Sequence, residues 1–416
     1  MFNRIVDNSW DFRLADTKEY THCYHAYPAM MIPQVARKLI NDFKPEGKCE
    51  LIFDPYMGSG TTLVEANIAG INAIGTDINP LARLISASKI QHFNIELIDS
   101  YISNAQLLGF QYTKEKVINT DFSRISNYSF WYTEESLLKL SYISQYIESL
   151  PEEVRLFFNI ALSEVVRECS FTRNGEFKRF RMNTKQLEKF NPDIFGLFAT
   201  KLERNINGLK QFNNANKEAF SKIYSFNTVY EIPEEILPNN SVDMIVTSPP
   251  YGDSRTTVAY GQFSRWANEW FGFKEAKNID NLLMGGKRQN EENFETFSIR
   301  EELETIKKLD SKRYEEVIAF LNDYNHSIKN ISKRVRIGGR VCYVVGNRNV
   351  KGVQIPLDYF TAEMFEKYGF THEQTIVRGI PNKRMPSKTS PTNVAGNKVS
   401  TMSNEYIVIL TKQRDE

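Results

Sequence analysis

Short apolar runs alternate with helical patterns in the first part of the chain. Residues 28–43 and 62–69 carry apolar side chains at the spacing of helices, while Cys49–Phe53 and Asn72–Thr76 are compact apolar runs typical of buried strands. Residues 78–89 again have helical spacing. This β-α-β-α alternation predicts a parallel sheet that is covered by helices on both faces.

The alternation stops in the middle of the chain. Residues 95–220 contain helical patterns at 136–147, 151–166 and 194–212 but few runs that resemble a buried strand. The stretch is too long for a loop, so we interpret it as an inserted, mainly helical region. The predicted organisation is a first half of an α/β domain at residues 1–95, a helical insertion at 96–220 and a second half at 221–416.

Strand patterns return in the last part of the chain, which brings the expected number of strands to seven. The later strands are expected at 222–226, 242–246, 340–345, 373–377 and 405–410, with helices at 313–335 and 357–368. Gly and Asn punctuate residues 252–293, for which we expect an irregular conformation, and the polar segment 381–403 is expected to be an exposed loop.

Composition excludes several classes of protein. The chain has 416 residues and a net charge of +1, and no apolar run approaches the roughly 20 residues of a membrane helix. The N-terminus has no signal-peptide pattern, so a cytoplasmic location is expected. Four widely spaced cysteines and five histidines show no metal-ligand or redox spacing, so we expect no metal.

One glycine-rich segment is typical of a site for a nucleotide-like cofactor. The first strand ends at Asp54 and leads into Pro-Tyr-Met-Gly-Ser-Gly-Thr-Thr62, where Gly58 and Gly60 allow a sharp turn before a helix N-terminus. The segment lacks the lysine of a P-loop and the full three-glycine dinucleotide pattern. An amino acid moiety fits, with its carboxylate on the loop amides and its ammonium on Asp54. Asp77, at the end of the next strand, can accept from ribose hydroxyls.

A second motif follows the strand at 242–246. Ser248-Pro-Pro-Tyr251 contains two prolines, which fix φ and remove two backbone donors. The carbonyls of Ser248 and Pro249 would then face a ligand as acceptors, with the Ser248 hydroxyl beside them and Tyr251 available for stacking. Such a turn suits a planar base with an exocyclic amino group. Taken alone, each motif could also be an ordinary turn of another α/β enzyme.

Together the two motifs resemble those of the amino-group DNA methyltransferases, which use S-adenosylmethionine. The resemblance implies a Rossmann-like α/β fold with a seven-stranded methyltransferase sheet and a mainly helical insertion. Thr21-His-Cys-Tyr-His-Ala-Tyr-Pro28 is similar to the family motif that lines the methionine part of the cofactor, and Asn227 stands where the family usually has an Asp or Asn near the adenine. The implied catalytic residues are Ser248, Pro249, Pro250 and Tyr251; the implied cofactor-binding residues are Tyr27, Pro28, Asp54, Pro55, Gly58, Gly60, Thr61, Asp77, Ile78 and Asn227.

The resemblance also bears on the substrate. In the family, Ser-Pro-Pro-Tyr most often accompanies cytosine-N(4) methylation, and Asp- or Asn-Pro-Pro-Tyr accompanies adenine-N(6) methylation. We therefore favour cytosine-N(4) over adenine-N(6), with a base flipped out of the duplex and a role in restriction–modification or host defence. An RNA or protein-amide methyltransferase and a catalytically inactive DNA-binding module are the alternatives.

The expected partner is double-stranded DNA, with a cognate restriction endonuclease as a further possible partner. The motif order resembles family members whose target-recognition region lies between the cofactor and catalytic halves. Basic residues of the insertion are therefore candidates for phosphate contacts, although they also suit a solvated charged face. The candidates are Lys178, Arg179 and Arg181 in the insertion, Arg255 after the catalytic turn, and Lys383 and Arg384 in the polar loop.

Overall fold

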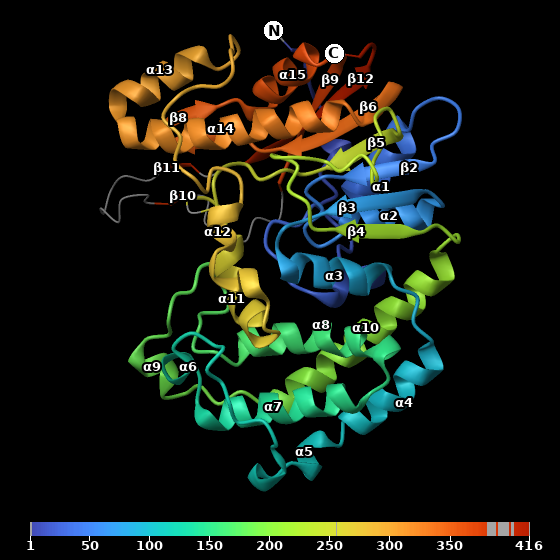
Figure 1. Cartoon of the computed structure of the whole chain (residues 1–416), viewed down its shortest axis with the longest axis vertical. Helices are drawn as coiled ribbons and strands as arrows, with labels where there is room; N and C mark the ends of the chain where they lie inside the picture. The colour runs from blue at the N-terminus through green and yellow to red at the C-terminus, as the bar shows by residue number, and fades with distance from the viewer. Residues whose placement is uncertain (1, 255, 381–387, 390–398, 401–402, 416) are drawn as a thin grey trace.

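The computed structural model describes residues 2–254, 256–380, 388–389, 399–400 and 403–415. Their main feature is an eight-stranded sheet with the order β1-β9-β12-β6-β5-β2-β3-β4 (Figure 1). Its strands are β1 (Arg4–Val6), β2 (Leu51–Asp54), β3 (Asn72–Thr76), β4 (Ser221–Tyr224), β5 (Val242–Thr247), β6 (Val335–Val345), β9 (Phe370–Gly379) and β12 (Asn404–Lys412). Two small pairs, β7 (Arg348–Val350) with β8 (Val353–Ile355) and β10 (Lys388–Thr389) with β11 (Val399–Ser400), lie outside it.

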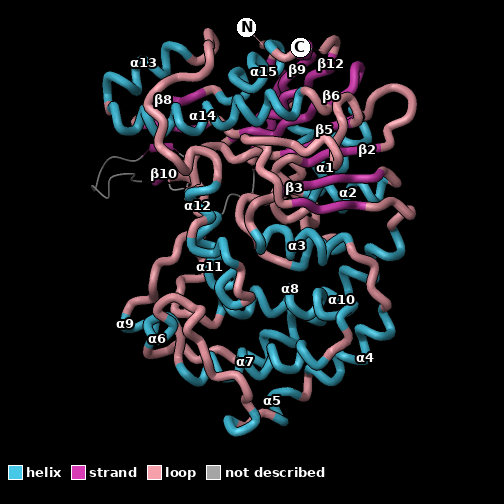
Figure 2. The backbone as a smooth tube through the Cα atoms, in the orientation of Figure 1, coloured by secondary structure: helices cyan, strands magenta, loops and turns pink. Residues whose placement is uncertain are grey.

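Helices cover both faces of the sheet and form a separate layer beneath one edge (Figure 2). The helices are α1 (Pro33–Phe43), α2 (Thr61–Ala69), α3 (Pro80–Ile90), α4 (Ile95–Ala105), α5 (Leu108–Gln111), α6 (Tyr128–Trp131), α7 (Glu134–Ser149), α8 (Glu152–Glu168), α9 (Thr184–Leu187), α10 (Ile194–Ala215), α11 (Tyr260–Trp270), α12 (Ile279–Leu282), α13 (Arg300–Leu309), α14 (Ser311–Ser332) and α15 (Leu357–Lys367). No helix of this described part of the chain is long and apolar enough to cross a membrane.

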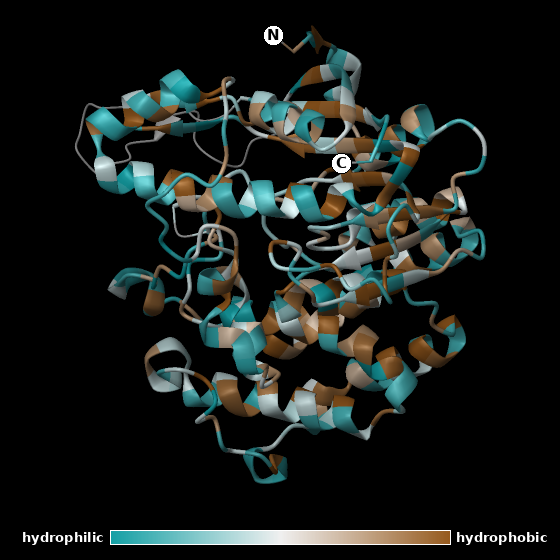
Figure 3. Ribbon diagram, turned by 45° about the horizontal axis from the view of Figure 1, so that its top comes forward, coloured by the Kyte–Doolittle hydropathy of each residue, from teal (hydrophilic) through white to brown (hydrophobic). Residues whose placement is uncertain are grey.

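Alternating side chains of the central strands enter two different cores. On one face, Ile52 and Met244 pack with residues of α1 and α2. On the other, Phe53 and Ile245 pack with residues of α14 and α15. Because successive strand residues point to opposite faces, a strand buried on both faces is a continuous apolar run. Figure 3 shows this as hydrophobic stretches along the central strands.

The predicted Rossmann-like α/β fold is confirmed, and its seven expected strands are all present. The structure adds an eighth strand, β1, which pairs in parallel with β9 at the sheet edge. We did not predict it because three residues give too short a pattern to recognise. The sheet is also not wholly parallel: β12 runs antiparallel to both β6 and β9.

Helices α4 to α10 form the layer beneath the sheet, which we call the helical lobe (residues 95–215; Figure 1). Its apolar core includes Phe157 and Phe198, and it continues into Trp266 of α11 and Leu81 of α3. Helix α11 thus packs between the lobe and the sheet. The expectation of an irregular segment at 252–293 was wrong here, because α11 buries an aromatic face whose helical spacing we overlooked between the flanking glycines.

Candidate active site

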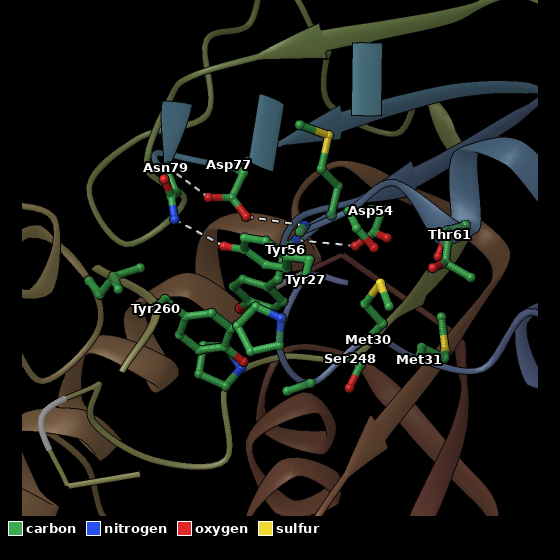
Figure 4. Close-up of a pocket in the computed structure, with 18 residues that line it drawn as sticks. Tyr27, Met30, Met31, Asp54, Tyr56, Thr61, Asp77, Asn79, Ser248 and Tyr260 are labelled. Carbon is green, nitrogen blue, oxygen red and sulfur yellow. Dashed lines mark hydrogen bonds between the residues drawn. The ribbon is translucent and has the colours of Figure 1, made fainter. Parts of the chain in front are cut away.

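A pocket lies at the carboxyl ends of β2, β3 and β5, where ligands of open α/β sheets bind (Figure 4). The space within it not filled by atoms, its opening to solvent included, is about 620 Å³. Its lining consists of Tyr27, Pro28, Ala29, Met30, Met31, Asp54, Tyr56, Met57, Gly58, Ser59, Thr61, Thr62, Asp77, Asn79, Ser248, Pro250, Tyr260 and Leu283. Both sequence motifs therefore meet at one cavity, together with the segment that precedes α1.

The glycine-rich loop turns from β2 into α2 at one wall of this pocket. Gly60 is the N-cap of α2 and has φ +74°, and Gly58 has φ +48°, both in the left-handed region that favours glycine. A Cβ on Gly60 would lie 2.7 Å from Ser86 Oγ. That hydroxyl donates to the Gly58 carbonyl at 2.9 Å. The loop is therefore held against α3, with the N-terminus of α2 directed at the pocket.

Two carboxylates stand at the strand ends. Asp54 Oδ1 accepts a hydrogen bond of 2.6 Å from the Thr247 hydroxyl and one of 3.2 Å from the Tyr56 amide. Asp77 accepts from the Gly58 amide at 3.1 Å and from the Asn79 amide at 2.8 Å. Burial raises the pKa of each carboxyl to about 6, against the effect of these hydrogen bonds. Each carboxylate would therefore gain from a cationic or hydrogen-bond-donating ligand.

Asn79 joins the pocket wall to α11. Its side-chain amide donates to Tyr27 Oη at 3.0 Å and to Ser264 Oγ at 3.1 Å. Its Oδ1 accepts from the Asn268 side chain at 3.1 Å. The ring of Tyr27 stacks on Tyr260, with centroids 6.0 Å apart and planes inclined by 27°. This network gives the pocket an aromatic wall next to Asp77 (Figure 4).

The Ser248–Tyr251 turn, which the sequence predicts to be catalytic, follows β5 directly, and Ser248 lies across the pocket from Asp77 (Figure 4). Ser248 and Pro250 line the cavity. The hydroxyls of Ser248 and Tyr251 are 3.1 Å apart, and Tyr251 Oη donates to Glu405 Oε1 at 3.1 Å. Tyr251 is half-buried and packs against the core that α14 and α15 form with the sheet. The turn is therefore tied to β12 through its tyrosine.

The structure brings most of the predicted site residues to this pocket. Pro55, Gly60, Ile78, Asn227, Pro249 and Tyr251 are not part of its lining. The side chain of Asn227 is used locally: Nδ2 donates to the Leu282 carbonyl at 3.2 Å and Oδ1 accepts from the Val229 amide at 3.0 Å. Sequence reasoning missed Tyr56 and Tyr260 in the lining. Tyr56 lies within the recognised glycine-rich motif, whereas Tyr260 lies in the helix that we overlooked.

Two of the three predicted basic residues of the lobe, Arg179 and Arg181, pack on aromatic rings. The Arg179 guanidinium lies 4.8 Å from the ring centre of Trp266, and burial lowers its pKa. The Arg181 guanidinium lies 4.2 Å from the ring of Phe130, which is exposed, and Lys178 is half-buried. Arg255, Lys383 and Arg384 lie outside the described residues. Among the described residues, no group of His, Cys, Asp and Glu side chains could hold a metal ion.

The pocket suits a cofactor with an amino acid end and a nucleoside end. A helix N-terminus and a buried carboxylate at Asp54 match a zwitterion. Asp77 and the rings of Tyr27 and Tyr260 match a ribose and an apolar, planar group. The mostly apolar lining, with a few polar groups at fixed positions, is typical of small-molecule sites.

Comparisons with known proteins define the class. Residues 2–87 match the N6_N4_Mtase family model, described as DNA methylase. The Type II methyltransferase M.MvaI of Kocuria varians is 39% identical over 98% of this chain and 95% of its own length. The Type II methyltransferase M.BsoBI of Geobacillus stearothermophilus is 23% identical over 86% of this chain and 80% of its own.

The chain therefore belongs to the amino-group DNA methyltransferases of Type II. Its methyl donor is S-adenosylmethionine, which the residues of the pocket fit. The cofactor, when bound, supplies an electrophilic methyl group on a sulfonium. Asp54, Asp77 and the glycine-rich loop are the residues that would hold it, next to the Ser248–Tyr251 turn.

Proposed function

We propose that the protein methylates cytosine at N(4) within a specific duplex sequence, as the modification enzyme of a restriction–modification system with a cognate endonuclease. The observation that carries the proposal is that Ser248 and Pro250 of the Ser248-Pro-Pro-Tyr251 turn line the same pocket as the Asp54 and Asp77 carboxylates. Family members with a serine at this position most often act on cytosine, whereas adenine-N(6) methylation is the second candidate. The relatives named as Type II methyltransferases support the biological role.

The proposed chemistry needs positioning more than a strong base. The two hydrogens of the amino group are shared among the acceptors of the turn, which are the carbonyls of Ser248 and Pro249 and the Ser248 hydroxyl oxygen, and this aligns the nitrogen lone pair with the methyl group. Tyr251 stacks on the base plane. The nitrogen attacks the methyl carbon as the carbon–sulfur bond breaks, and the nitrogen then loses a proton. A paired base cannot enter the pocket, so the nucleotide is flipped out of the duplex.

The insertion at residues 96–220, most of which is the helical lobe, is the proposed DNA-recognition region, with residues 1–95 and 221–416 forming the methyltransferase domain. Support comes from α11, which begins at the pocket with Tyr260 and packs on the lobe with Trp266. The Arg179 amide also contacts Gln262 of this helix, with a nitrogen-to-oxygen distance of 3.3 Å. We propose phosphate contacts for Lys178, Arg179 and Arg181. The proposal for Arg255, Lys383 and Arg384 rests on the sequence alone.

The test is methylation of unmodified plasmid DNA by the purified protein with labelled S-adenosylmethionine, followed by nucleoside mass spectrometry. We expect 4-methylcytosine. A 6-methyladenine product would overturn the choice of base but keep the amino-group mechanism. Transfer to RNA or to protein, with none to DNA, would overturn the proposal.

A further inference from the structure

A chain of hydrogen bonds leads from the catalytic turn to a buried ion pair. The Ser248 and Tyr251 hydroxyls lie 3.1 Å apart, and Tyr251 Oη donates to Glu405 Oε1 at 3.1 Å. The other oxygen of Glu405 pairs with Arg378, its cross-strand neighbour on β9. Arg378 is buried, and its Nε donates to the Trp10 carbonyl at 2.8 Å.

The partners fix the direction of every hydrogen bond. Arg378 only donates, so Glu405 Oε2 accepts from it, and Glu405 Oε1 accepts from Tyr251. The single hydrogen of the Tyr251 hydroxyl is therefore used on Glu405. Burial, followed by the charge of Glu405, raises the pKa of Tyr251, which keeps this hydrogen in place. The contact between Tyr251 and Ser248 must then use the hydrogen of Ser248.

This direction leaves only lone pairs on the Ser248 oxygen for a ligand in the pocket. An amino group offers hydrogens to such an oxygen, whereas a ring carbonyl would meet it with repulsion between lone pairs. We propose that Glu405 is a positioning residue that acts through Tyr251 to make Ser248 an obligate acceptor, so that the turn selects an amino group over a carbonyl. The inference rests on the proposed function, because it assigns Ser248 to the reacting amino group.

Glu405→Gln tests the proposal because Arg378 dictates how the glutamine must lie. The guanidinium needs an acceptor, so the glutamine oxygen faces Arg378 and its NH2 group faces Tyr251. Tyr251 then accepts from Gln and donates to Ser248, which turns the hydrogen of Ser248 toward the pocket. We expect kcat on plasmid DNA to fall about tenfold to a hundredfold. The affinity for S-adenosylmethionine should not change.

A double-mutant cycle separates this role from a merely structural one. Tyr251→Phe keeps the ring and removes the hydroxyl, so Glu405→Gln should have no further effect on kcat in that background. Glu373→Gln is the matched control, since Glu373 pairs with Arg340 on the same sheet without contacting Tyr251. Thermal melting checks that each variant is folded. Should Glu405→Gln not fold, Tyr251→Phe alone should show a comparable loss of kcat at unchanged cofactor affinity.

Wild-type kcat in Glu405→Gln, or an equal loss of kcat with and without the Tyr251 hydroxyl, would overturn the inference. Wild-type kcat in Tyr251→Phe would overturn it as well. A wild-type protein that methylates no DNA amino group is a different result: it overturns the proposed function, and the inference falls with it.

Discussion

The hydroxyl of Thr247 donates a hydrogen bond of 2.6 Å to Asp54 Oδ1. Thr247 is the last residue of β5 and immediately precedes the Ser248–Tyr251 turn, whereas Asp54 is the last residue of β2 and begins the glycine-rich loop. The two strands are parallel neighbours, so their carboxyl ends meet at one edge of the sheet. This bond links the two motifs directly and orients the Asp54 carboxylate, which lines the pocket and which we propose faces the cofactor.

Thr247→Val should weaken binding of S-adenosylmethionine about threefold to tenfold at neutral pH, which corresponds to the roughly 1 kcal/mol of one lost hydrogen bond. Valine keeps the shape but removes the donor that lowers the pKa of Asp54, so this pKa should rise above its value of about 6. Isothermal titration calorimetry measures the affinity. Thr247→Ser keeps the hydroxyl and should bind as the wild type does; equal affinities in all three proteins would show that the bond does not act on the site.

Cofactor affinity should fall as the pH is lowered through about 6. Burial raises the pKa of Asp54 and of Asp77 to about 6, so both carboxyls are ionised at higher pH and become neutral below it. A ligand that favours the charged form then loses about tenfold in affinity for each carboxyl between roughly pH 8 and pH 5. Dissociation constants over this range are the measurement. Asp77→Asn removes one titrating group and should give a shallower profile, and a flat wild-type profile would contradict the assignment.

Gly60→Ala should reduce stability and cofactor affinity more than the same change at Gly47, a glycine with no atoms near its Cβ position. Alanine at Gly60 would have to adopt a φ of +74°, and its Cβ would lie 2.7 Å from Ser86 Oγ, which is closer than van der Waals contact allows. Gly47 has φ +81° with nothing near its Cβ position, so Gly47→Ala should cost only the backbone strain of about 1–2 kcal/mol. Thermal unfolding and cofactor titration of both variants provide the test. Equal loss of stability and unchanged cofactor affinity in both would show that the contact with Ser86 is unimportant.

How much could be predicted from the sequence depended on how local each signal was. The strand ends at Asp54 and Asp77 and the Ser248–Tyr251 turn were recognisable because each motif combines a short apolar run with residues of distinct backbone chemistry. Contacts between residues distant in sequence could not be recognised in this way. Glu405 and Tyr251 are 154 positions apart, and only the fold of the sheet brings them together.

Tyr260 shows a second kind of limit. It begins a helix whose apolar residues Phe263, Trp266, Ala267 and Trp270 follow ordinary helical spacing, which we overlooked between the flanking glycines. Only the fold shows that the first residue of this helix reaches the pocket while Trp266 packs on the lobe. The basic residues of the lobe show a third kind of limit. Their number suggested a solvated or DNA-facing surface, but the side chain of Arg167 is buried against the ring of Phe263, where it contributes to packing.

Alanine at both Lys178 and Arg181 should weaken DNA binding and reduce its dependence on salt. If each side chain contacts one phosphate, the plot of log K against log salt should become less steep, with the magnitude of its slope decreasing by about 0.9 for each residue removed. Arg181 is the sharper test, since its guanidinium is held over the exposed ring of Phe130, next to the lobe surface. Fluorescence anisotropy with a labelled duplex at several salt concentrations measures the slope.

The control is Lys48→Ala, which removes an exposed lysine from the segment before β2, outside the lobe. It should leave the salt slope nearly unchanged, and all variants should bind S-adenosylmethionine with wild-type affinity. Arg179→Ala should behave differently, because this guanidinium packs on Trp266 and its loss should lower the melting temperature. Were the double variant to keep the wild-type slope while Lys48→Ala reduced it, the DNA would have to approach from the side of β2, and the helical lobe would lose its proposed role.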